Sequence, residues 1–281
     1  MAEAGAPFSV LILTLNEEAD LPRCLESVAG CDDIVVLDSG SKDGTPEIAR
    51  AAGARVFERT FDTFAGQRNF AQRDIPFRHR WVFHLDADER FTPALMAECA
   101  TAARRENIAG FYVAPRMQWR GRWIPHCTDF PAYQARFARI PDFEFVEVGH
   151  GQRERPGTSM AWLQEGYLHD LSSGGTAEWL EKHRRYARAE AKAHLANAGE
   201  FDWRELFSPN ALVRRRTIKR LSFQLPARPL LRFIYQYALR RGFLDGASGW
   251  EYCRLLARYE GFIATEIRAL KKSSQGSPQP S

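Results

Sequence analysis

Short apolar runs alternate with segments of helical pattern over the first 115 residues. Five runs rich in Val, Ile or Phe predict buried strands, at 9–14, 33–37, 54–58, 80–85 and 110–114. Helical patterns lie between them, at 18–29, 45–52, 65–74 and 93–106. In Thr45-Pro46 and Thr92-Pro93 a capping residue precedes proline, as at the start of a helix. The alternation predicts an α/β fold, in which a mainly parallel sheet carries helices on both faces.

The pattern changes after residue 115. Aromatic residues set among Arg, Gly and Pro at 116–170 predict loops and short, antiparallel strands. From Glu178 the pattern is helical and basic, and the tail at 273–281 has the low-complexity composition of a disordered segment. We therefore expect an α/β domain at 1–177, a basic helical region at 178–272 and a disordered tail.

The formal net charge of +4 conceals a basic block. Residues 180–241 hold 15 Lys and Arg against 5 Asp and Glu, whereas the rest of the chain holds 24 against 30. The densest part contains Arg214-Arg215-Arg216 and Lys219-Arg220. Such a block favours anionic partners such as phosphates, lipid headgroups or nucleic acid. A solvated helix face is the alternative interpretation.

Length, cysteine content and hydropathy limit which class of protein this can be. The 281 residues, 44% of them hydrophobic, suffice for a large domain with a full core. Five cysteines with no C-x-x-C pair indicate neither a zinc site nor a disulfide framework. The apolar run at 8–15 ends in acidic residues, unlike a signal peptide, and no stretch of 18 apolar residues is present. We expect a cytosolic protein, or one that lies on a membrane without crossing it.

Polar side chains follow three of the predicted strands, in the segments 14–18, 38–45 and 86–89. Ligands of parallel sheets bind beyond the carboxyl ends of the strands. No G-x-G-x-x-G follows the first strand, so a dinucleotide-binding sheet is not indicated. If the fourth strand runs on through Asp86 and Asp88, both carboxylates point to one side and favour Mg²⁺ or Mn²⁺. A polar loop that caps the next helix is the alternative.

Three strings carry a resemblance to a known family: VLILTLNEE at 10–18, VVLDSGSKDGT at 35–45 and HLDADE at 84–89. In order and spacing they resemble the family 2 inverting glycosyltransferases, which implies the GT-A fold over about residues 8–115. The segments 149–154, 168–169, 182–186 and 242–246 are similar to the subgroup that contains the lipopolysaccharide-core β-glucosyltransferases.

The resemblance implies that 1–115 binds the nucleotide sugar and 116–177 the acceptor. On the donor side it implies Thr14, Asn16 and Glu17 in the nucleotide pocket, Asp38 at uracil, Arg68 and Asn69 beside the nucleotide, Asp86 near the ribose, Asp88 on the metal that bridges the diphosphate, and His169 as a further metal or phosphate ligand.

The general base and the acceptor residues are less sharply defined. Glu154 aligns best with the base of the family and Glu147 is the second candidate, although an ion pair with a neighbouring arginine would explain either residue structurally. Trp119 and Trp123 are candidates for the acceptor face or for ordinary core packing. Lys182, Arg185 and Tyr186 are candidates to hold the diphosphate or an acceptor phosphate.

The resemblance thus implies a transferase, dependent on Mg²⁺ or Mn²⁺, that moves a hexose, with glucose as the expected sugar. The donor is a UDP-sugar and the acceptor a lipopolysaccharide-core or other cell-envelope glycan or glycolipid. The polar stripe at 229–241 predicts a helix with one of two positions. It lies on an anionic membrane surface, the inner face of the cytoplasmic membrane, or it packs against the catalytic domain.

A sugar nucleotidyltransferase would need a basic glycine-rich loop where the segment 16–18 is acidic. A nucleic-acid-binding protein would leave Asp38, Asp86 and Asp88 unexplained, so no nucleic acid partner is expected; an inert membrane scaffold is a third alternative.

Overall fold

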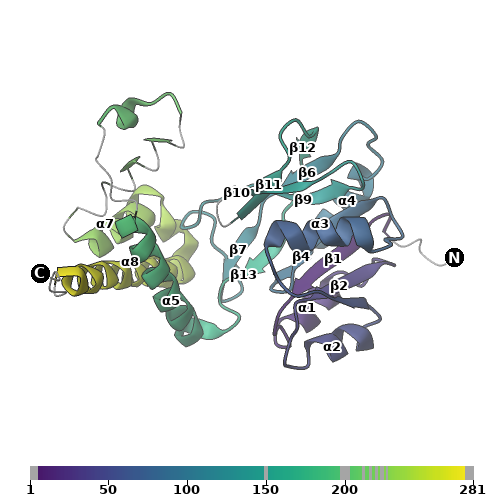
Figure 1. Cartoon of the computed structure of the whole chain (residues 1–281), viewed down its shortest axis with the longest axis horizontal. Helices are drawn as coiled ribbons and strands as arrows, with labels where there is room; N and C mark the ends of the chain where they lie inside the picture. Colours follow the sequence, from purple (N-terminus) through teal and green to yellow (C-terminus); the bar gives the residue numbers. More distant parts are fainter. Residues whose placement is uncertain are drawn as a thin grey trace, which may run out of the picture. The chain divides into compact units, whose positions relative to one another are not determined.

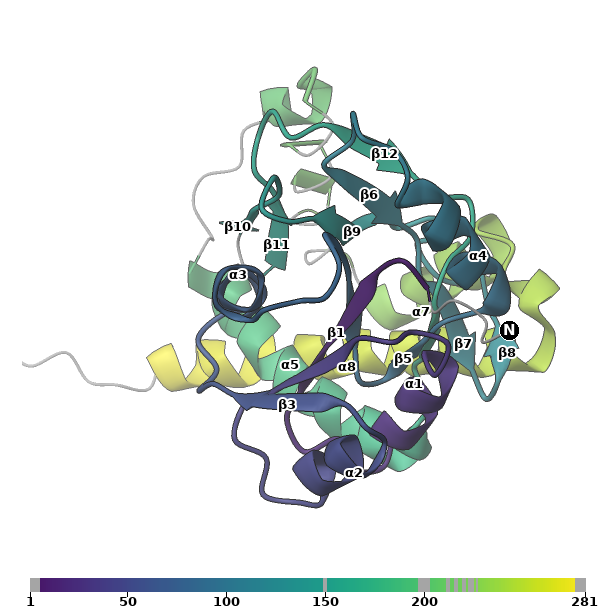
Figure 2. The same ribbon diagram turned by 90° about the vertical axis from the view of Figure 1, so that its right-hand side faces the viewer.

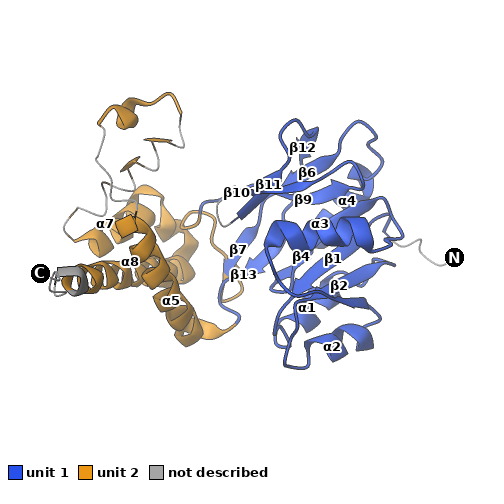
Figure 3. Cartoon of the chain, viewed as in Figure 1, with its two compact units in different colours: residues 1–118, 129–173 blue, residues 119–128, 174–281 orange. Residues whose placement is uncertain are grey.

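The computed structural model describes residues 6–148, 151–196, 203–210, 213–214, 217–218, 221, 225 and 227–275. The chain forms two compact units (Figure 3): residues 1–118 with 129–173, and residues 119–128 with 174–281. The predicted disordered tail lies largely outside the described residues, as do Arg215, Arg216, Lys219 and Arg220 of the basic block and residues 149–150.

The first unit is built on a seven-stranded sheet of order β12-β6-β9-β4-β1-β2-β3 (Figure 1). Its strands are β1 (Ser9–Thr14), β2 (Ile34–Asp38), β3 (Arg55–Glu58), β4 (Trp81–Asp86), β6 (Gly110–Val113), β9 (Gln134–Arg139) and β12 (Met160–Trp162). The four strands from β3 to β4 are parallel, and β9 runs antiparallel to both β4 and β6. All five strands predicted from the apolar runs are confirmed to within one residue at each end.

Four helices cover the two faces of this sheet, and their placement follows from side-chain alternation. Val10 and Ile12 point into the larger core, with α1 (Leu21–Ser27), α2 (Thr45–Ala51) and α4 (Pro93–Ala102). Leu11 points to the opposite face, where Ala71 and Ile75 of the α3 segment (helix Phe64–Asp74) pack. Figure 2 shows α3 on one side of the sheet and α1 and α4 on the other.

One of the two predicted helix caps is correct. The Thr92 hydroxyl accepts a hydrogen bond from the Leu95 amide at 3.1 Å, which caps α4. Thr45 is not an N-cap, because Gly44 holds that position and Thr45 lies inside the first turn of α2. The Thr45 hydroxyl instead accepts a hydrogen bond from the Glu17 amide, so it joins two loops at the edge of the sheet.

Two smaller β structures lie in the segment after residue 115, where short strands were expected. In one, β13 (Leu168–Asp170) pairs with β5 (Glu89–Arg90) and with β7 (Arg116–Trp119). In the other, β10 (Phe145–Val148) and β11 (Gly151–Glu154) form an antiparallel hairpin. The pairing of β13 with β5 sets His169 directly opposite Glu89.

The second unit is helical. It contains β8 (Arg122–Trp123), α5 (Gly175–Ala196), the 3₁₀ turns η1 (Trp203–Phe207) and η3 (Gly242–Asp245), α7 (Arg228–Ile234), the π turn η2 (Tyr235–Leu239) and α8 (Gly246–Gln275). Trp119 is fully buried in it, with its ring beside those of Trp179 and Tyr252. Among the described residues, no helix combines the length and the apolar character needed to cross a bilayer.

Candidate active site

The carboxyl ends of β1, β2 and β4 meet at one edge of the sheet. The strand register pairs Thr14 with Asp38, and Leu13 with Asp86. The loops that follow these strands therefore lie side by side, because neighbouring parallel strands end at the same edge. This edge brings together the three polar segments at 14–18, 38–45 and 86–89.

Asp38 organises the loop that follows β2. Its buried carboxylate accepts hydrogen bonds from the Thr14 hydroxyl (2.8 Å), the Gly40 and Ser41 amides (2.9 and 2.8 Å) and the Ser41 hydroxyl (2.5 Å). Burial by itself would raise the pKa of Asp38, but these hydrogen bonds outweigh burial and lower it. Gly40 has φ +90°, a conformation that glycine adopts without strain. The Asp38 carboxylate therefore accepts four hydrogen bonds from the protein itself.

The loop after β1 is fastened to the loop after β2. The Asn16 amide donates to the Ser41 hydroxyl at 2.8 Å, and the Asn16 side-chain oxygen accepts from the Lys42 amide at 2.8 Å. The Glu17 amide donates to the Thr45 hydroxyl at 2.8 Å. The predicted nucleotide-pocket residues Thr14, Asn16 and Glu17 thus belong to one hydrogen-bonded pair of loops.

Asp86 lies between two arginines. Its carboxylate is 2.6 Å from the Arg68 guanidinium and 3.0 Å from that of Arg136, and both arginines are buried. Burial would raise the pKa of Asp86, but the two positive charges lower it further than burial raises it. Strand β4 ends at Asp86 and a turn follows, so the alternation of a strand does not extend to Asp88. The two carboxylates consequently have different partners.

Glu89 is a member of this network that sequence reasoning missed. Its fully buried carboxylate contacts the Arg136 guanidinium at 2.8 Å and accepts a hydrogen bond from the Asp86 amide at 2.9 Å. Burial raises the pKa of Glu89, the Asp86 charge adds to the rise, and Arg136 and His169 only partly oppose it. The sequence does contain a signal for Glu89, because this residue belongs to the polar segment 86–89 that follows a predicted strand.

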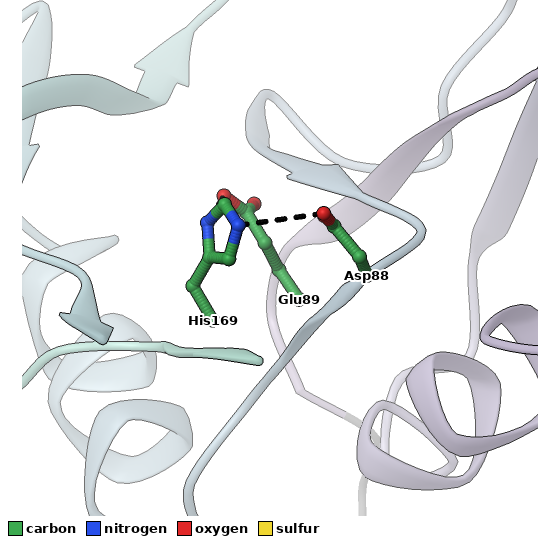
Figure 4. A group of neighbouring side chains, drawn as sticks. All are labelled: Asp88, Glu89 and His169. Carbon is green, nitrogen blue, oxygen red and sulfur yellow. Dashed lines mark ion pairs between the residues drawn. The ribbon is translucent and has the colours of Figure 1, made fainter. Parts of the chain in front are cut away.

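Asp88, Glu89 and His169 form a cluster with the composition of a divalent metal site (Figure 4). His169 Nε2 lies 3.4 Å from the Asp88 carboxylate and Nδ1 lies 3.5 Å from that of Glu89. All three residues offer ligand atoms within 4.8 Å of one another. Burial would lower the pKa of His169, but the two carboxylates raise it to about 10. The two carboxylates offer the oxygen ligands that Mn²⁺ or Mg²⁺ prefers, and the imidazole can add a nitrogen ligand after it loses its proton.

A cavity of about 730 Å³ opens beside this cluster within the first unit. Arg68, Asp86, Glu89, Arg136 and His169 are among its lining residues. Another part of the lining comes from Tyr112, Trp162 and Glu154. The Tyr112 hydroxyl donates to Glu154 at 2.6 Å, and the Tyr112 and Trp162 rings lie 5.4 Å apart between centroids. Burial and the Glu154 contact raise the pKa of Tyr112 to about 12, so its hydroxyl keeps its proton.

The sequence profile described as Glycosyl transferase family 2 matches residues 9–152, about half of the chain and the segment that carries most of this site. The chain belongs to glycosyl transferase family 2. Its first unit has the GT-A fold expected from the sequence, with a mostly parallel mixed sheet between helices, and a helical region follows.

Several relatives of this family 2 chain are known. It is 39% identical over 118 residues to LpsC of Rhizobium meliloti, described as a lipopolysaccharide core biosynthesis glycosyltransferase; the match covers 39% of the chain and 42% of LpsC. It is 23% identical over 282 residues to the glycosyltransferase RP128 of Rickettsia prowazekii, covering 95% of the chain and 88% of RP128. The crystal structure of S. aureus TarS 1-349 aligns over 95% of the chain and 91% of TarS, with 16% identity and a TM-score of 0.43.

The two candidate bases of the family 2 chain lie on the β10–β11 hairpin in different settings. Glu154 lines the cavity and is half-buried. Glu147 lies opposite Gln152 in the hairpin, is exposed and does not line the cavity. The ion pair of Arg155 is with Glu144, so Arg155 does not account for Glu154.

Asn69 connects this hairpin to helix α3. Its side-chain amide donates to the Phe145 carbonyl at 2.8 Å and its side-chain oxygen accepts from the Phe145 amide at 2.9 Å. Phe145 lies directly opposite Glu154 in the hairpin. Asn69 therefore acts on the position of Glu154, and it is not among the residues that line the cavity.

The predicted acceptor and phosphate residues belong to the second unit. Trp119 is buried in its core, whereas Trp123 is exposed on β8. Lys182, Arg185 and Tyr186 are exposed on α5. The buried ring of Trp119 favours the core-packing alternative for that residue.

Proposed function

We propose that this family 2 chain is an inverting hexosyltransferase that moves glucose from a UDP-sugar to a lipopolysaccharide-core or other cell-envelope glycan, with Mn²⁺ or Mg²⁺ as its cofactor. The observation that carries the proposal is the Asp88–Glu89–His169 cluster at a cavity whose lining also contains the carboxylate of Glu154. The sequence strings at 10–18, 35–45 and 84–89 support the sugar-nucleotide donor. The relation to LpsC supports an acceptor in the lipopolysaccharide core.

In this proposal, neighbouring residues on the donor side have separate roles. The loops after β1 and β2, fastened through Asn16 and Asp38, form the floor for the nucleoside. Asp88 and His169 would hold the divalent cation, and the cation would neutralise negative charge as the diphosphate leaves. Arg68 and Arg136 keep Asp86 ionised, so that Asp86 can accept hydrogen bonds from a ribose.

Transfer with inversion is one displacement at the anomeric carbon, so it needs one base to take the proton of the acceptor hydroxyl. We assign this role to Glu154. Tyr112 donates to one oxygen of Glu154 and so orients the carboxylate, while no hydrogen bond from the described residues engages the other oxygen. The exposed ring of Trp162 beside Tyr112 provides an aromatic surface against which the apolar face of a sugar can pack.

A ligand-dependent melting experiment tests the donor and metal part of the proposal. UDP with Mn²⁺ is expected to raise the melting temperature of the protein, because a ligand that binds only the folded state stabilises it. Asp88→Ala should abolish this rise. Asp74→Ala, which removes an exposed carboxylate at the end of α3, is the matched control and should keep it. A full response in Asp88→Ala, or none in the native protein with any nucleotide sugar, would contradict the proposal.

A further inference from the structure

In the second unit, the segment formed by α7 and η2 is apolar on two opposite sides. On its inner side, the rings of Phe233 and Tyr237 lie 5.2 Å apart, and both lie beside the ring of Trp250 on α8. Gln236, on the same side, is buried. These contacts fix which side of the segment faces the unit.

The outer side is also apolar and is exposed. Its large side chains are between 43% and 73% exposed; they are Leu230, Leu231, Ile234, Tyr235 and Leu239 of α7 and η2, and the exposed Leu244 follows in η3. Residues four apart lie on the same side of a helix, so the five side chains of α7 and η2 form one surface. Together with Leu244 this surface is here called the α7–η3 face. A helix with such a face normally buries it, and an exposed patch of this kind marks an interaction site.

The charges within the same elements have one sign. Residues 227–244 contain Arg228, Arg232, Arg240 and Arg241 and no acidic residue. Arg228 pairs with Glu260, and among the described residues the other three form no ion pair with a carboxylate. Exposed apolar side chains interleaved with arginines are the composition of a segment that lies in the interface of an anionic membrane.

A groove next to this face is lined by two arginines. It measures about 670 Å³ and includes Pro229, the residue directly before Leu230 of the face. Apolar residues such as Leu180 and Phe262 line it, together with the guanidinium groups of Arg184 and Arg258. Arg184 lies 5.1 Å from the centroid of the Phe262 ring. In the described part of the chain neither arginine pairs with a carboxylate, so both guanidiniums are available to a phosphate.

We propose that the α7–η3 face docks on a leaflet of anionic phospholipid and that the groove binds the phosphate of one lipid headgroup. A second copy of the chain is a poorer occupant, because a symmetric contact would place the arginines of one face against those of the other. The proposal does not depend on the glycosyl-transfer reaction, since lipid binding is measured without donor or acceptor.

Flotation of the full chain with vesicles tests the apolar part. The protein should float with vesicles of phosphatidylcholine mixed with phosphatidylglycerol and much less with phosphatidylcholine alone. The double variant Leu230→Glu/Leu239→Glu should need at least about tenfold more lipid for half-maximal binding, because two interfacial leucines are lost. Val148→Glu changes a similarly exposed apolar residue of the first unit and should bind as the native protein does.

A second pair of variants tests the groove. Arg184→Ala/Arg258→Ala should weaken binding to the anionic vesicles roughly fivefold for each arginine and reduce its salt dependence. Binding to phosphatidylcholine alone should change much less, because the choline group offsets the charge of its phosphate. Arg50→Ala/Arg80→Ala removes two exposed arginines of the first unit and is the matched control.

Three results would overturn the proposal. The first is equal binding of the native protein to both kinds of vesicle. The second is native-like flotation of Leu230→Glu/Leu239→Glu, with thermal unfolding showing that this variant is folded. The third is a dimer, seen by light scattering without lipid, that these substitutions dissociate, which would assign the face to a second copy.

Discussion

At the scale of single residues, the site depends on how three carboxylates share a small set of partners. Arg136 contacts both Asp86 and Glu89, and Arg68 adds a second positive charge to Asp86. Asp88 has only the His169 ring as an ion-pair partner among the described residues. Because Arg68 and Arg136 already balance the charge of ionised Asp86, we propose Asp88 as the carboxylate that accepts a cation.

Substitution of each candidate base in turn tests which glutamate takes the proton of the acceptor. Glu154→Gln should lower the rate of transfer by roughly 10²–10⁴-fold, because the amide cannot take a proton from the acceptor. Binding of UDP with Mn²⁺, measured by calorimetry, should stay unchanged. Glu147→Gln alters an exposed glutamate of the same hairpin and serves as the control. Near-normal transfer by Glu154→Gln with loss in Glu147→Gln would move the role to Glu147.

At the scale of elements, polar side chains that hydrogen-bond from one element to another hold the strands and the hairpin in place. Asn69 holds the β10–β11 hairpin to α3 at the edge of the sheet that carries the cavity. At the opposite end of the strands, the buried Asp33 carboxylate accepts hydrogen bonds from the Ser9 hydroxyl at 2.5 Å and from the Arg78 amide at 2.8 Å, and it pairs with Arg55 at 2.7 Å. Asp33 therefore joins β1, β2, β3 and the loop before β4.

The interactions of the Asp33 carboxylate predict that the stability of the fold depends on pH. Burial would raise the pKa of Asp33, but its hydrogen bonds and Arg55 lower it below the unfolded value. A depressed pKa in the folded state stabilises the fold above the unfolded pKa of about 4, and this stabilisation is lost as the pH falls further. In urea unfolding at pH 7, Asp33→Asn should lower the free energy of unfolding by about 1–3 kcal/mol. The difference from the native protein should shrink below about pH 4; a constant difference would contradict this role.

At the scale of the whole molecule, the chain leaves the first unit at residue 118 and re-enters it at 129. The intervening segment is fastened into the helical unit by Asp245. The carboxylate of Asp245, which is buried, accepts from the His126 and Cys127 amides at 3.0 and 2.8 Å and contacts His126 Nδ1 at 2.6 Å. Gly242 packs so closely that a Cβ there would lie 2.7 Å from the Gln236 carbonyl oxygen. The GFLDG segment at 242–246 is thus a clamp for residues 119–128.

Removal of this carboxylate should affect one unit and spare the other. Asp245→Ala leaves two amides without their acceptor, so we expect a loss of about 1–3 kcal/mol in unfolding free energy for each amide that stays buried and unpaired. Hydrogen exchange in peptides spanning 124–128 should become faster, whereas binding of UDP with Mn²⁺ should not change. Asp129→Ala, an exposed neighbour, is the control. Loss of nucleotide binding in Asp245→Ala would show that the clamp also serves the first unit.

The order of strands and helices in the first unit was predictable from sequence, because burial of alternating apolar residues is a local property of the chain. Parallel strands also place their carboxyl ends together, so the convergence of Thr14, Asp38 and Asp86 followed from that prediction. The capping role of Thr45 was wrong, because a contact across to the Glu17 amide engages its hydroxyl.

Only the tertiary structure decided which charged groups face one another. Arg136 gives no local signal, yet the antiparallel entry of β9 beside β4 brings it to Asp86 and Glu89. Tyr112 and Trp162 come together with Glu154 through strand pairing and the β10–β11 hairpin, which the spacing of the sequence does not encode. The chain alone therefore determined the sheet and its polar edge, whereas the partners of each carboxylate depend on contacts between residues far apart in sequence.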